Sequence, residues 1–401
     1  VITGNGAAAI AAKLARPDVV AAYPITPQTE VIEKISDFHA SGDMDCELIT
    51  VEGENSAMNS VMAASLAGGR VFTASSSWGL VFMYDAVLAV AGARAPVVMI
   101  NVNRETPGII AVSSGQQDMI STRDSGWLFL IAESCQEVLD LVLQAYRLAE
   151  DHEIQLPVMV HYDGFYLSYL SEGVEIPTQE EADQFLSVLE TQPRRTVLHP
   201  GEKLGVGSHG ILGGYLELRH KHLSAMNRSK AKFDAIDQEY AKIFNRSWGG
   251  QLELYRTEDA DVVLVGSGSM CGTIKTVIDE YREKGIKVGL VKIRMYRPFP
   301  AEALIEALKG VKVAGVVDRS LAFGFEGGPI YLELKAFETK MGGTQLLSFI
   351  DGIANTDITK ANVAQMIDQT CDRAAGKKVP EVTWISYPQA NDTDDQSPDD
   401  V

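Results

Sequence analysis

Cysteine pairs, long apolar runs and basic charge are all scarce in this sequence, and each scarcity excludes a class of protein. The 401 residues include four cysteines, which lie far apart and form no CxxC pair: Cys46, Cys135, Cys271 and Cys371. This spacing predicts neither a structural zinc site nor an iron–sulfur cluster bound by this chain alone. Scattered unpaired thiols are typical of a reducing cytoplasm.

Membrane and nucleic-acid binding are also disfavoured. No apolar run approaches the ~18 residues that a membrane-spanning helix needs. The first residues, VITGNGAAAIAAKLA, lack the basic start and cleavage pattern of a secretory signal. A formal net charge of -19 and a pI of about 4.8 predict a surface that repels phosphate backbones and anionic lipid. We therefore expect a cytoplasmic protein that binds neither nucleic acid nor membrane.

The first part of the chain alternates short apolar strands with helix-like stretches. The predicted strands are Val19–Tyr23, Leu48–Val51, Arg70–Ala74, Pro96–Val102 and Leu156–Tyr162. Helix-like stretches between them include Ser56–Ala67, Leu80–Ala93 and Gln136–Ala149. Near-continuous apolar strands that alternate with helices predict a parallel sheet covered on both faces.

The rest of the chain predicts a linker and a second α/β unit. The segment from Leu186 to Gly250 has the composition of an irregular loop followed by one exposed helix. His220 and His222 on that helix are too few ligands for a metal site. DVVLVGSGSM then begins another strand-and-turn pattern. We expect an α/β domain at 1–185, a linker and exposed helix at 186–255, a second α/β domain at 256–380 and an acidic tail at 381–401.

Polar side chains follow the ends of the first two predicted strands. In AAYPITPQTE, Thr26 is placed to cap the next helix, with Pro27 at its first position. In VEGENSAM, Glu52 and Glu54 lie at the second strand-to-helix corner, where a carboxylate also suits the helix dipole. Open α/β sheets bind ligands at the carboxyl ends of their strands. Both a structural and a ligand-binding interpretation therefore apply to these corners.

Further candidates lie downstream. Arg104 ends a third strand, and a guanidinium at a sheet edge can bind a carboxylate through two parallel hydrogen bonds. Asp118, Arg123 and Asp124 are more typical of a structural charge network than of catalysis. The turn GSGSMCG at 266–272 is a weak dinucleotide signal, because the segment about 20 residues on lacks a clear acidic partner.

Several motifs together resemble a known family. YPITPQTE, VEGENSAM, TASSSWGL, NRETPG and QQDMISTRDSGW occur in this order, and VKIRMYRPFPAEAL and VVDRSLAFGFEGGP follow. This pattern resembles the α subunit of the 2-oxoacid:ferredoxin oxidoreductase family, typified by pyruvate:ferredoxin oxidoreductase. The resemblance covers nearly the whole chain. It implies a domain that binds the pyrimidine of thiamine diphosphate, followed by a transketolase C-terminal-like domain.

The resemblance also implies an activity and roles for residues. The family oxidatively decarboxylates 2-oxoacids to acyl-CoA and CO2, with thiamine diphosphate, iron–sulfur clusters and coenzyme A as co-substrate. Glu54 matches the cofactor glutamate, whose carboxylate favours the imino tautomer of the aminopyrimidine. Arg104 matches the arginine that binds the substrate carboxylate, and Thr26 the threonine that faces the reacting substrate. The residues that match the family's other cofactor contacts are Tyr23, Pro24, Ile25 and Gly79.

Two parts of the usual machinery are missing from the chain. Thiamine enzymes bind the diphosphate through Mg²⁺ at a GDG motif, and this sequence contains neither GDG nor cysteine clusters. The resemblance therefore places Mg²⁺ and the iron–sulfur clusters on partner subunits: a diphosphate-binding subunit, an iron–sulfur subunit and a γ-type subunit. The chain alone would be inactive, and its electron acceptor would be ferredoxin or a flavoprotein.

One loop departs from the family pattern. Pyruvate-type members carry a stretch resembling SAPxNIWxD after the arginine, whereas this chain reads ETPGIIAVSSGQQD. By counting, Ser113 stands where the bulky tryptophan would be. A hydroxymethyl group in place of a large ring opens volume near the substrate. We therefore expect a 2-oxoacid larger than pyruvate, such as phenylglyoxylate or another aryl or branched 2-oxoacid.

Three alternatives stay open at this point. The chain could serve a pyruvate or 2-oxoglutarate oxidoreductase, if the loop of Ser113 does not touch the substrate or another side chain refills the gap. It could be a non-catalytic scaffold subunit. It could also be a stand-alone nucleotide-binding dehydrogenase built on GSGSMCG.

Overall fold

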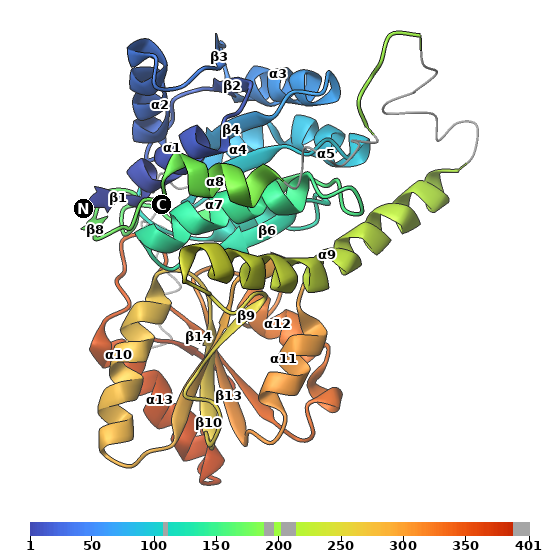
Figure 1. Cartoon of the computed structure of the whole chain (residues 1–401). Helices are drawn as coiled ribbons and strands as arrows, with labels where there is room; N and C mark the ends of the chain where they lie inside the picture. Colours follow the sequence, from blue (N-terminus) through green and yellow to red (C-terminus); the bar gives the residue numbers. More distant parts are fainter. Residues whose placement is uncertain (107–110, 188–195, 202–213, 388–401) are drawn as a thin grey trace, which may run out of the picture.

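The computed structural model describes residues 1–106, 111–187, 196–201 and 214–387. Two α/β domains lie one above the other, the first coloured blue to green and the second yellow to red in Figure 1. Helix α9 (Tyr215–Phe244) runs along the junction between them. The predicted fold class, two α/β domains with parallel sheets, is confirmed.

The first sheet has the strand order β12-β6-β7-β5-β4-β2-β3 within the described residues. Its strands are β2 (Val19–Ala22), β3 (Glu47–Thr50), β4 (Val71–Ser75), β5 (Val98–Asn103), β6 (Leu128–Ile131), β7 (Val158–Asp163) and β12 (Met295–Arg297). All neighbours pair in parallel except β12, which is antiparallel to β6. Strand β12 belongs to the predicted second domain but pairs with β6 of the first sheet. One strand therefore crosses the domain boundaries, which themselves stay a prediction.

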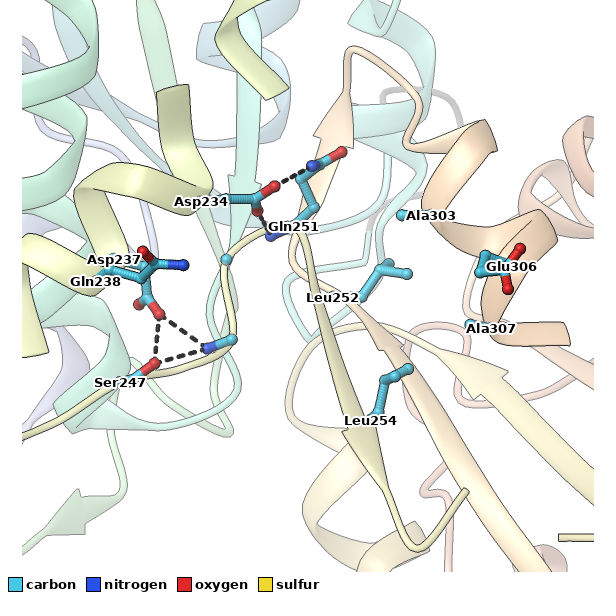
Figure 2. A pocket seen from close by; sticks show the side chains of 12 residues that line it. Asp234, Asp237, Gln238, Ser247, Gln251, Leu252, Leu254, Ala303, Glu306 and Ala307 are labelled. Carbon is cyan, nitrogen blue, oxygen red and sulfur yellow. Dashed lines mark hydrogen bonds between the residues drawn. The ribbon is translucent and has the colours of Figure 1, made fainter. Parts of the chain in front are cut away.

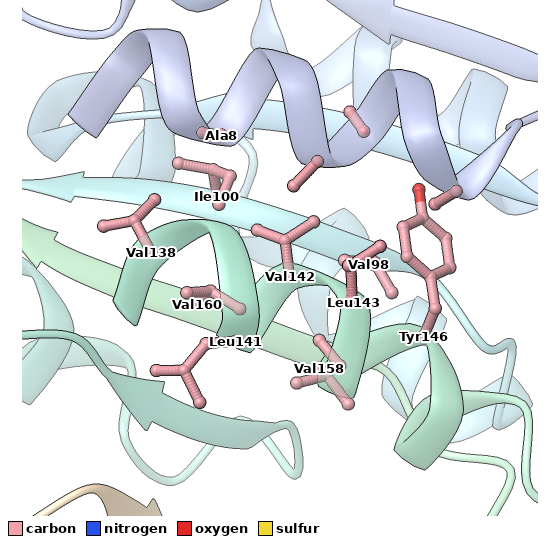
Figure 3. Packing of buried hydrophobic residues seen from close by; sticks show 14 of the residues in the cluster. Ala8, Val98, Ile100, Val138, Leu141, Val142, Leu143, Tyr146, Val158 and Val160 are labelled. Carbon is pink, nitrogen blue, oxygen red and sulfur yellow. The ribbon is translucent and has the colours of Figure 1, made fainter. Parts of the chain in front are cut away.

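Helices cover both faces of the first sheet. One face packs against α1 (Gly4–Ala15), α2 (Thr29–Ser41) and α7 (Cys135–Ala149), and the other against α3 (Glu54–Leu66), α4 (Ser77–Phe82) and α5 (Tyr84–Ala93). Alternate residues of a strand point to opposite faces. Val98 and Ile100 accordingly pack with Val142 between α1 and α7 (Figure 3), whereas Met99 belongs to the cluster on the opposite face. Shorter elements are α6 (Gln117–Thr122), α8 (Gln179–Leu186) and the pair β1 (Ile2–Thr3) with β8 (Ser171–Glu172).

The second sheet has the order β15-β14-β13-β10-β11-β9 and is parallel except for β9. Its strands are β9 (Leu252–Tyr255), β10 (Val262–Gly266), β11 (Val288–Ile293), β13 (Val313–Asp318), β14 (Gln345–Ile350) and β15 (Val382–Trp384). Helices α10 (Met270–Glu283) and α13 (Lys360–Ala374) cover one face, and α11 (Ala301–Leu308) and α12 (Pro329–Lys335) the other. A short 3₁₀ turn, Glu338–Lys340, precedes β14.

The predicted exposed helix is exposed over only part of its length. The beginning of α9, residues 215–221, is exposed and extends beyond the two domains (Figure 1). From His222 onward the helix is buried on one side, through residues spaced three or four apart: Ala225, Ser229, Phe233, Ile236 and Tyr240. This spacing places one face of the helix against α7 and α8. The prediction of an exposed helix is wrong for this longer part, because composition suggested a linker and the periodicity of the apolar residues was not used.

Two local predictions are corrected. Thr26 does not cap α2, because a hydrogen-bonded turn from Ile25 O to Gln28 N intervenes and the helix begins at Thr29. The stretch Leu80–Ala93 is part of two helices, α4 and α5, which meet at Met83.

The acidic tail from 388 onward lies outside the described residues, as do parts of the predicted linker, 188–195 and 202–213. No helix in the described ranges is long and apolar enough to cross a membrane.

Candidate active site

The predicted site residues follow four neighbouring strands of the first sheet. Strands β5, β4, β2 and β3 lie side by side, and their carboxyl ends meet at one edge. Arg104 follows β5, Thr26 follows β2, and Glu54 follows β3. Gly79 lies in α4, directly after β4. The parallel pairing therefore gathers these residues at the edge where open α/β sheets bind ligands.

Glu54 is a largely buried residue whose carboxylate bonds no residue that the structure describes. It is the first residue of α3 and is 8% exposed. Within the described residues, no side chain or backbone group forms a hydrogen bond or ion pair with its carboxylate. Glu52 at the same corner differs, because it is exposed and accepts a hydrogen bond from Ser56 Oγ at 2.5 Å. The Glu54 oxygens are not fully buried, so the carboxylate is open to a ligand or a partner group at this corner.

Gly79 is the close neighbour of this carboxylate. A Cβ on Gly79 would lie 2.6 Å from Glu54 Oε1 and would collide with Ser75 Oγ. We expect Gly79→Ala to displace the Glu54 carboxylate and to lower activity of the assembled protein by at least tenfold, because small misplacement at a reacting centre is costly. Gly92→Ala is the matched control, since no heavy atom lies within 4 Å of its added Cβ. Equal activity of Gly79→Ala and Gly92→Ala would contradict this prediction, and steady-state turnover measures it.

Thr26 and Arg104 are in direct contact. Arg104 Nη1 donates to the backbone carbonyl of Thr26 at 2.8 Å, and Nε donates to that of Ala111 at 2.7 Å. These bonds fix the guanidinium plane, and Nη2 makes no hydrogen bond to any described residue. Burial lowers the pKa of Arg104 while the charge of Asp118 opposes this, and a guanidinium stays protonated in either case. The group is thus a fixed cation at the sheet edge, suited to an anionic ligand.

The turn of Thr26 is supported from below. Asn5 Nδ2 donates to the carbonyl of Pro27 at 2.8 Å, and Tyr162 OH donates to Asn5 Oδ1 at 2.6 Å. Gly164 brings the end of β7 against the same turn, since a Cβ there would lie 3.0 Å from Pro27 Cγ. Thr26 itself is exposed, and so are Tyr23 and Pro24. Buried hydrogen bonds that the sequence does not reveal therefore hold this corner in place.

Asp118 lies apart from Arg123 and Asp124, the other charges of the predicted network. It is fully buried, whereas Arg123 approaches Glu333 at 3.5 Å and Asp124 at 4.0 Å on the surface. Asp118 Oδ2 accepts hydrogen bonds from the backbone N–H groups of Ser77 and Arg104, at 3.1 and 3.2 Å. It therefore joins the ends of β4 and β5 beside the site.

Several buried hydroxyl groups beneath the site lack partners. They lie in and directly after β4 and have no hydrogen bond in the described residues: Thr73 Oγ1, Ser75 Oγ and Ser76 Oγ. Native proteins usually satisfy buried polar atoms, and exceptions mark functional sites or bound groups. Of these hydroxyls, Ser75 Oγ lies with the Glu54 carboxylate against Gly79, at the end of β4.

The loop of Ser113 lines a cavity of about 540 Å³ between the two domains. Ser113 Oγ donates to Asn355 Oδ1 of the second domain at 2.5 Å. The cavity walls are mainly aromatic and aliphatic: Val112, Phe165, Tyr166, Tyr169 and Leu170, with Ala354, Asn355 and Asp357 from the second domain. Ala111, whose carbonyl accepts from Arg104, is two residues from Ser113 along the chain, whereas Arg104, Thr26 and Glu54 do not line the cavity.

The glycine turn at 266–272 binds a carboxylate of the chain itself. Ser269 N and Oγ donate to Asp163 Oδ2 at 2.8 and 2.6 Å, and Arg319 lies 3.0 Å from the same oxygen. Gly268 has φ +75°, and a Cβ there would lie 2.7 Å from Asp163 Oδ2. The carboxyl ends of β10 and β13, where a nucleotide would bind in an open sheet, are thus in contact with the first domain. This geometry argues against a dinucleotide at GSGSMCG.

Other candidate positions have structural roles. A second cavity of about 560 Å³ lies between α9, the segment before β9 and α11 (Figure 2). Its acidic residues are engaged, because Asp237 accepts from Ser247 and Gly249, and Asp234 from Gln251. His222 hydrogen-bonds the carbonyl of Gly126 at 2.7 Å. The described residues contain no cluster of His, Cys, Asp and Glu suited to a metal ion, and all four cysteines are free.

Comparison with protein-family models covers both domains. Residues 10–238 match the model described as pyruvate flavodoxin/ferredoxin oxidoreductase, thiamine diphosphate-binding. Residues 260–363 match the model of pyruvate:ferredoxin oxidoreductase core domain II. The first match alone spans more than half of the chain and contains every residue of the candidate site.

Similar proteins extend over nearly the whole chain. The pyruvate synthase subunit PorA of Methanothermobacter thermautotrophicus is 42% identical over 98% of this chain and 99% of its own length. The α subunit of NADH-dependent phenylglyoxylate dehydrogenase of Aromatoleum evansii is 36% identical over 96% of this chain and 94% of its own. Among solved structures, 2-oxoglutarate:ferredoxin oxidoreductase from Magnetococcus marinus matches 92% of this chain and 64% of that chain, with a TM-score of 0.70 and 20% identity. The last match shows the shared fold.

Proposed function

This chain belongs to the 2-oxoacid:ferredoxin oxidoreductase family as an α subunit, and from that premise we propose that it contributes half of a thiamine diphosphate site that oxidatively decarboxylates a 2-oxoacid to acyl-CoA and CO2. The single observation that carries the proposal is Glu54, a residue that is 8% exposed and whose carboxylate has no partner among the described residues. It lies at the same sheet edge as Arg104, a fixed cation for the substrate carboxylate.

The residues present fit the cofactor. Glu54 would accept a hydrogen bond from the pyrimidine, and Gly79 leaves room for its carboxylate. Tyr23, Pro24 and Ile25 would line the same edge from the end of β2. When bound, thiamine diphosphate supplies a carbon nucleophile for the 2-oxo group and accepts the electrons of the broken carbon–carbon bond.

The chain's own residues would position the reacting groups. Arg104 would bind the carboxylate of the 2-oxoacid through Nη2, which bonds no residue that the structure describes, with its plane fixed by the carbonyls of Thr26 and Ala111. Thr26 would present its exposed hydroxyl to the substrate from the neighbouring strand end. Glu54 would hold a proton on the pyrimidine side and so keep that ring in its reactive tautomer.

The remaining machinery would come from partner subunits. The face around Glu54 carries exposed apolar side chains on α4, with Trp78 45% exposed and Phe82 62% exposed. Exposed apolar groups beside a half-built site mark a protein interface. We assign this face to a diphosphate-binding subunit that supplies Mg²⁺. An iron–sulfur subunit and a γ-type subunit would pass the electron pair to ferredoxin or a flavoprotein, with coenzyme A as the acyl acceptor.

The cavity beside Ser113 supports a substrate larger than pyruvate. Its volume of about 540 Å³ and its aromatic walls suit an aryl or branched side chain, such as that of phenylglyoxylate. Pyruvate has only a methyl group to place there. The likeness to a phenylglyoxylate dehydrogenase α subunit agrees with this proposal.

Pyruvate is the second candidate substrate. It is favoured by the higher identity, 42%, to a pyruvate synthase subunit. In that case the aromatic cavity would lie outside the path of the substrate, and the Ser113–Asn355 contact would serve only to join the domains.

Replacing Ser113 tests the choice between these substrates. In the intact complex, purified without oxygen, we expect a bulky 2-oxoacid to outperform pyruvate in coenzyme A-dependent viologen reduction. We expect Ser113→Trp to lower kcat/KM for the bulky substrate by about tenfold to hundredfold, because the ring fills the cavity, while pyruvate turnover is retained. Ser113→Ala, which keeps the space, should preserve the preference. Faster turnover of pyruvate than of any bulky 2-oxoacid by the unaltered complex would contradict the larger substrate.

A further inference from the structure

Asp118 is a buried carboxylate at the meeting point of the cofactor side and the substrate side of the site. Its Oδ2 accepts three hydrogen bonds, from Ser77 N at 3.1 Å, Asn101 Nδ2 at 2.9 Å and Arg104 N at 3.2 Å. Its Oδ1 accepts from Met119 N at 2.7 Å. The residue is 0% exposed, so its side chain does not reach the outer face. None of the hydrogen bonds that it accepts comes from Glu54. It therefore acts through the groups that it holds.

The two backbone donors to Oδ2, Ser77 N and Arg104 N, lead directly to the candidate catalytic groups. Ser77 is the first residue of α4, and Gly79 two residues later touches the Glu54 carboxylate. Arg104 is the proposed cation for the substrate, and its own side chain holds Thr26. A continuous path of contacts thus runs from Glu54 through Asp118 to Arg104 and Thr26.

We propose that Asp118 is a positioning residue of the active site, which fixes the distance between the cofactor-side helix α4 and the substrate arginine Arg104 by binding both backbones as a carboxylate. The proposal rests on the proposed function for the identity of substrate and cofactor. The proposal goes beyond that function because it assigns the alignment of α4 with Arg104 to one buried side chain that touches neither substrate nor cofactor.

The chemistry requires the ionised form. Four N–H donors surround the two oxygens, and a carboxylate can accept all of them. A protonated or amidated side chain turns one acceptor into a donor, which would face an N–H group and push one backbone away. Burial raises the pKa of Asp118 to about 7 despite these hydrogen bonds. The arrangement therefore changes its protonation close to neutral pH.

Other titratable groups lie near Asp118 on the neighbouring elements. Glu105 follows Arg104, and burial together with the charge of Asp118 raises its pKa to about 7 as well. Arg319 at the end of β13 lowers the pKa of Glu105. His161 on β7 approaches Asn101 at 3.4 Å, but burial lowers its pKa to about 3, so it stays neutral. Burial also raises the pKa of Asp318 to about 7, but this carboxylate is held by Ile330 N and Tyr331 N of α12. Beside Arg104, Glu105 and Asp118 are the two groups near pH 7 that must be told apart.

The test compares Asp118→Asn with Glu105→Gln in the assembled complex. We expect Asp118→Asn to raise KM for the 2-oxoacid at least tenfold with a smaller change in kcat, because Arg104 binds ground state and transition state alike. For the unaltered complex, log(kcat/KM) should fall as the pH drops below about 7, since Asp118 gains a proton there. This acid limb should vanish in Asp118→Asn and persist in Glu105→Gln. An acid limb retained by Asp118→Asn, or KM within twofold of the unaltered complex, overturns the proposal.

A binding measurement keeps the test independent of turnover. Calorimetric titration of thiamine diphosphate with Mg²⁺ into the cofactor-free complex should show weaker binding by Asp118→Asn and unchanged binding by Glu105→Gln. If the unaltered complex turns over no 2-oxoacid, the proposed function fails, whereas this titration still decides the role of Asp118. Equal affinity of Asp118→Asn and the unaltered complex for thiamine diphosphate would overturn the positioning role of Asp118.

A milder variant covers the case in which Asp118→Asn does not fold. Asn101→Ala removes one donor from Oδ2 and leaves both backbone bonds in place. Loss of a hydrogen bond to the charged form disfavours that form, so the acid limb should move to higher pH. An acid limb at the same pH as in the unaltered complex would count against the proposal.

Discussion

Replacing Glu54 with glutamine is expected to lower coenzyme A-dependent 2-oxoacid oxidation by about 10²- to 10⁴-fold, the range typical of a lost acid–base group. Glutamine has nearly the same size and shape, so the packing against Gly79 is kept. The glutamine amide carries no negative charge, so it would no longer favour the reactive tautomer of the pyrimidine. Viologen reduction by the purified complex measures the effect.

Glu52→Gln is the matched control for this experiment. Glu52 lies two residues away at the same strand end, but it is exposed and bound to Ser56. We expect its replacement to change turnover less than threefold, because an exposed carboxylate at a helix start is worth little. If Glu54→Gln were as active as Glu52→Gln, the chain would be a non-catalytic scaffold and the partner subunits would hold the chemistry.

The sequence predicts the fold class and the edge of the sheet that carries the site. Apolar strands alternate with helices, and this pattern places Thr26, Glu54 and Arg104 after parallel strands. The contacts that align these residues could not be predicted in the same way. Asn5 binds Pro27 and Asp118 binds Ser77, across 22 and 41 residues of sequence. Neither pairing has a local pattern, because both depend on how the strands are ordered in the sheet.

Pairing between the domains is equally hidden from the sequence. Strand β12 has three residues and adds to β6 of the first sheet, far away along the chain. The Gly turn before α10 has a weak nucleotide pattern, yet it receives the buried carboxylate of Asp163. A glycine turn indicates that something approaches the backbone closely, and only the tertiary structure shows that this is the chain itself. The buried face of α9, by contrast, was available from its periodicity.

Replacing Glu137 with glutamine is expected to produce the largest loss of stability, about 3–5 kcal/mol. Glu137, Lys292 and Arg294 are all 0% exposed where α7 of the first domain meets β11 and the residue that follows it. Glu137 lies 2.9 Å from Lys292 Nζ and 2.5 Å from Arg294 Nε. The amide would leave Arg294 without its carboxylate partner in a dry environment. A lower urea midpoint of the purified complex measures the loss.

Acid should remove the same stabilisation in the unaltered protein. Burial alone would raise the pKa of Glu137, but the charges of Lys292 and Arg294 outweigh burial and lower the pKa to about 2 from 4.5. A carboxylate with a lowered folded-state pKa stabilises the protein above pH 4.5 and loses this effect as the pH falls toward about 2. We therefore expect the difference in urea midpoint between Glu137→Gln and the unaltered protein to shrink across this interval.

Glu306→Gln, at an exposed ion pair with Lys309, should leave the midpoint unchanged at every pH, because surface pairs contribute about 0–1 kcal/mol. A Glu137→Gln midpoint equal to that of Glu306→Gln at neutral pH would show that the buried cluster does not hold the domains together.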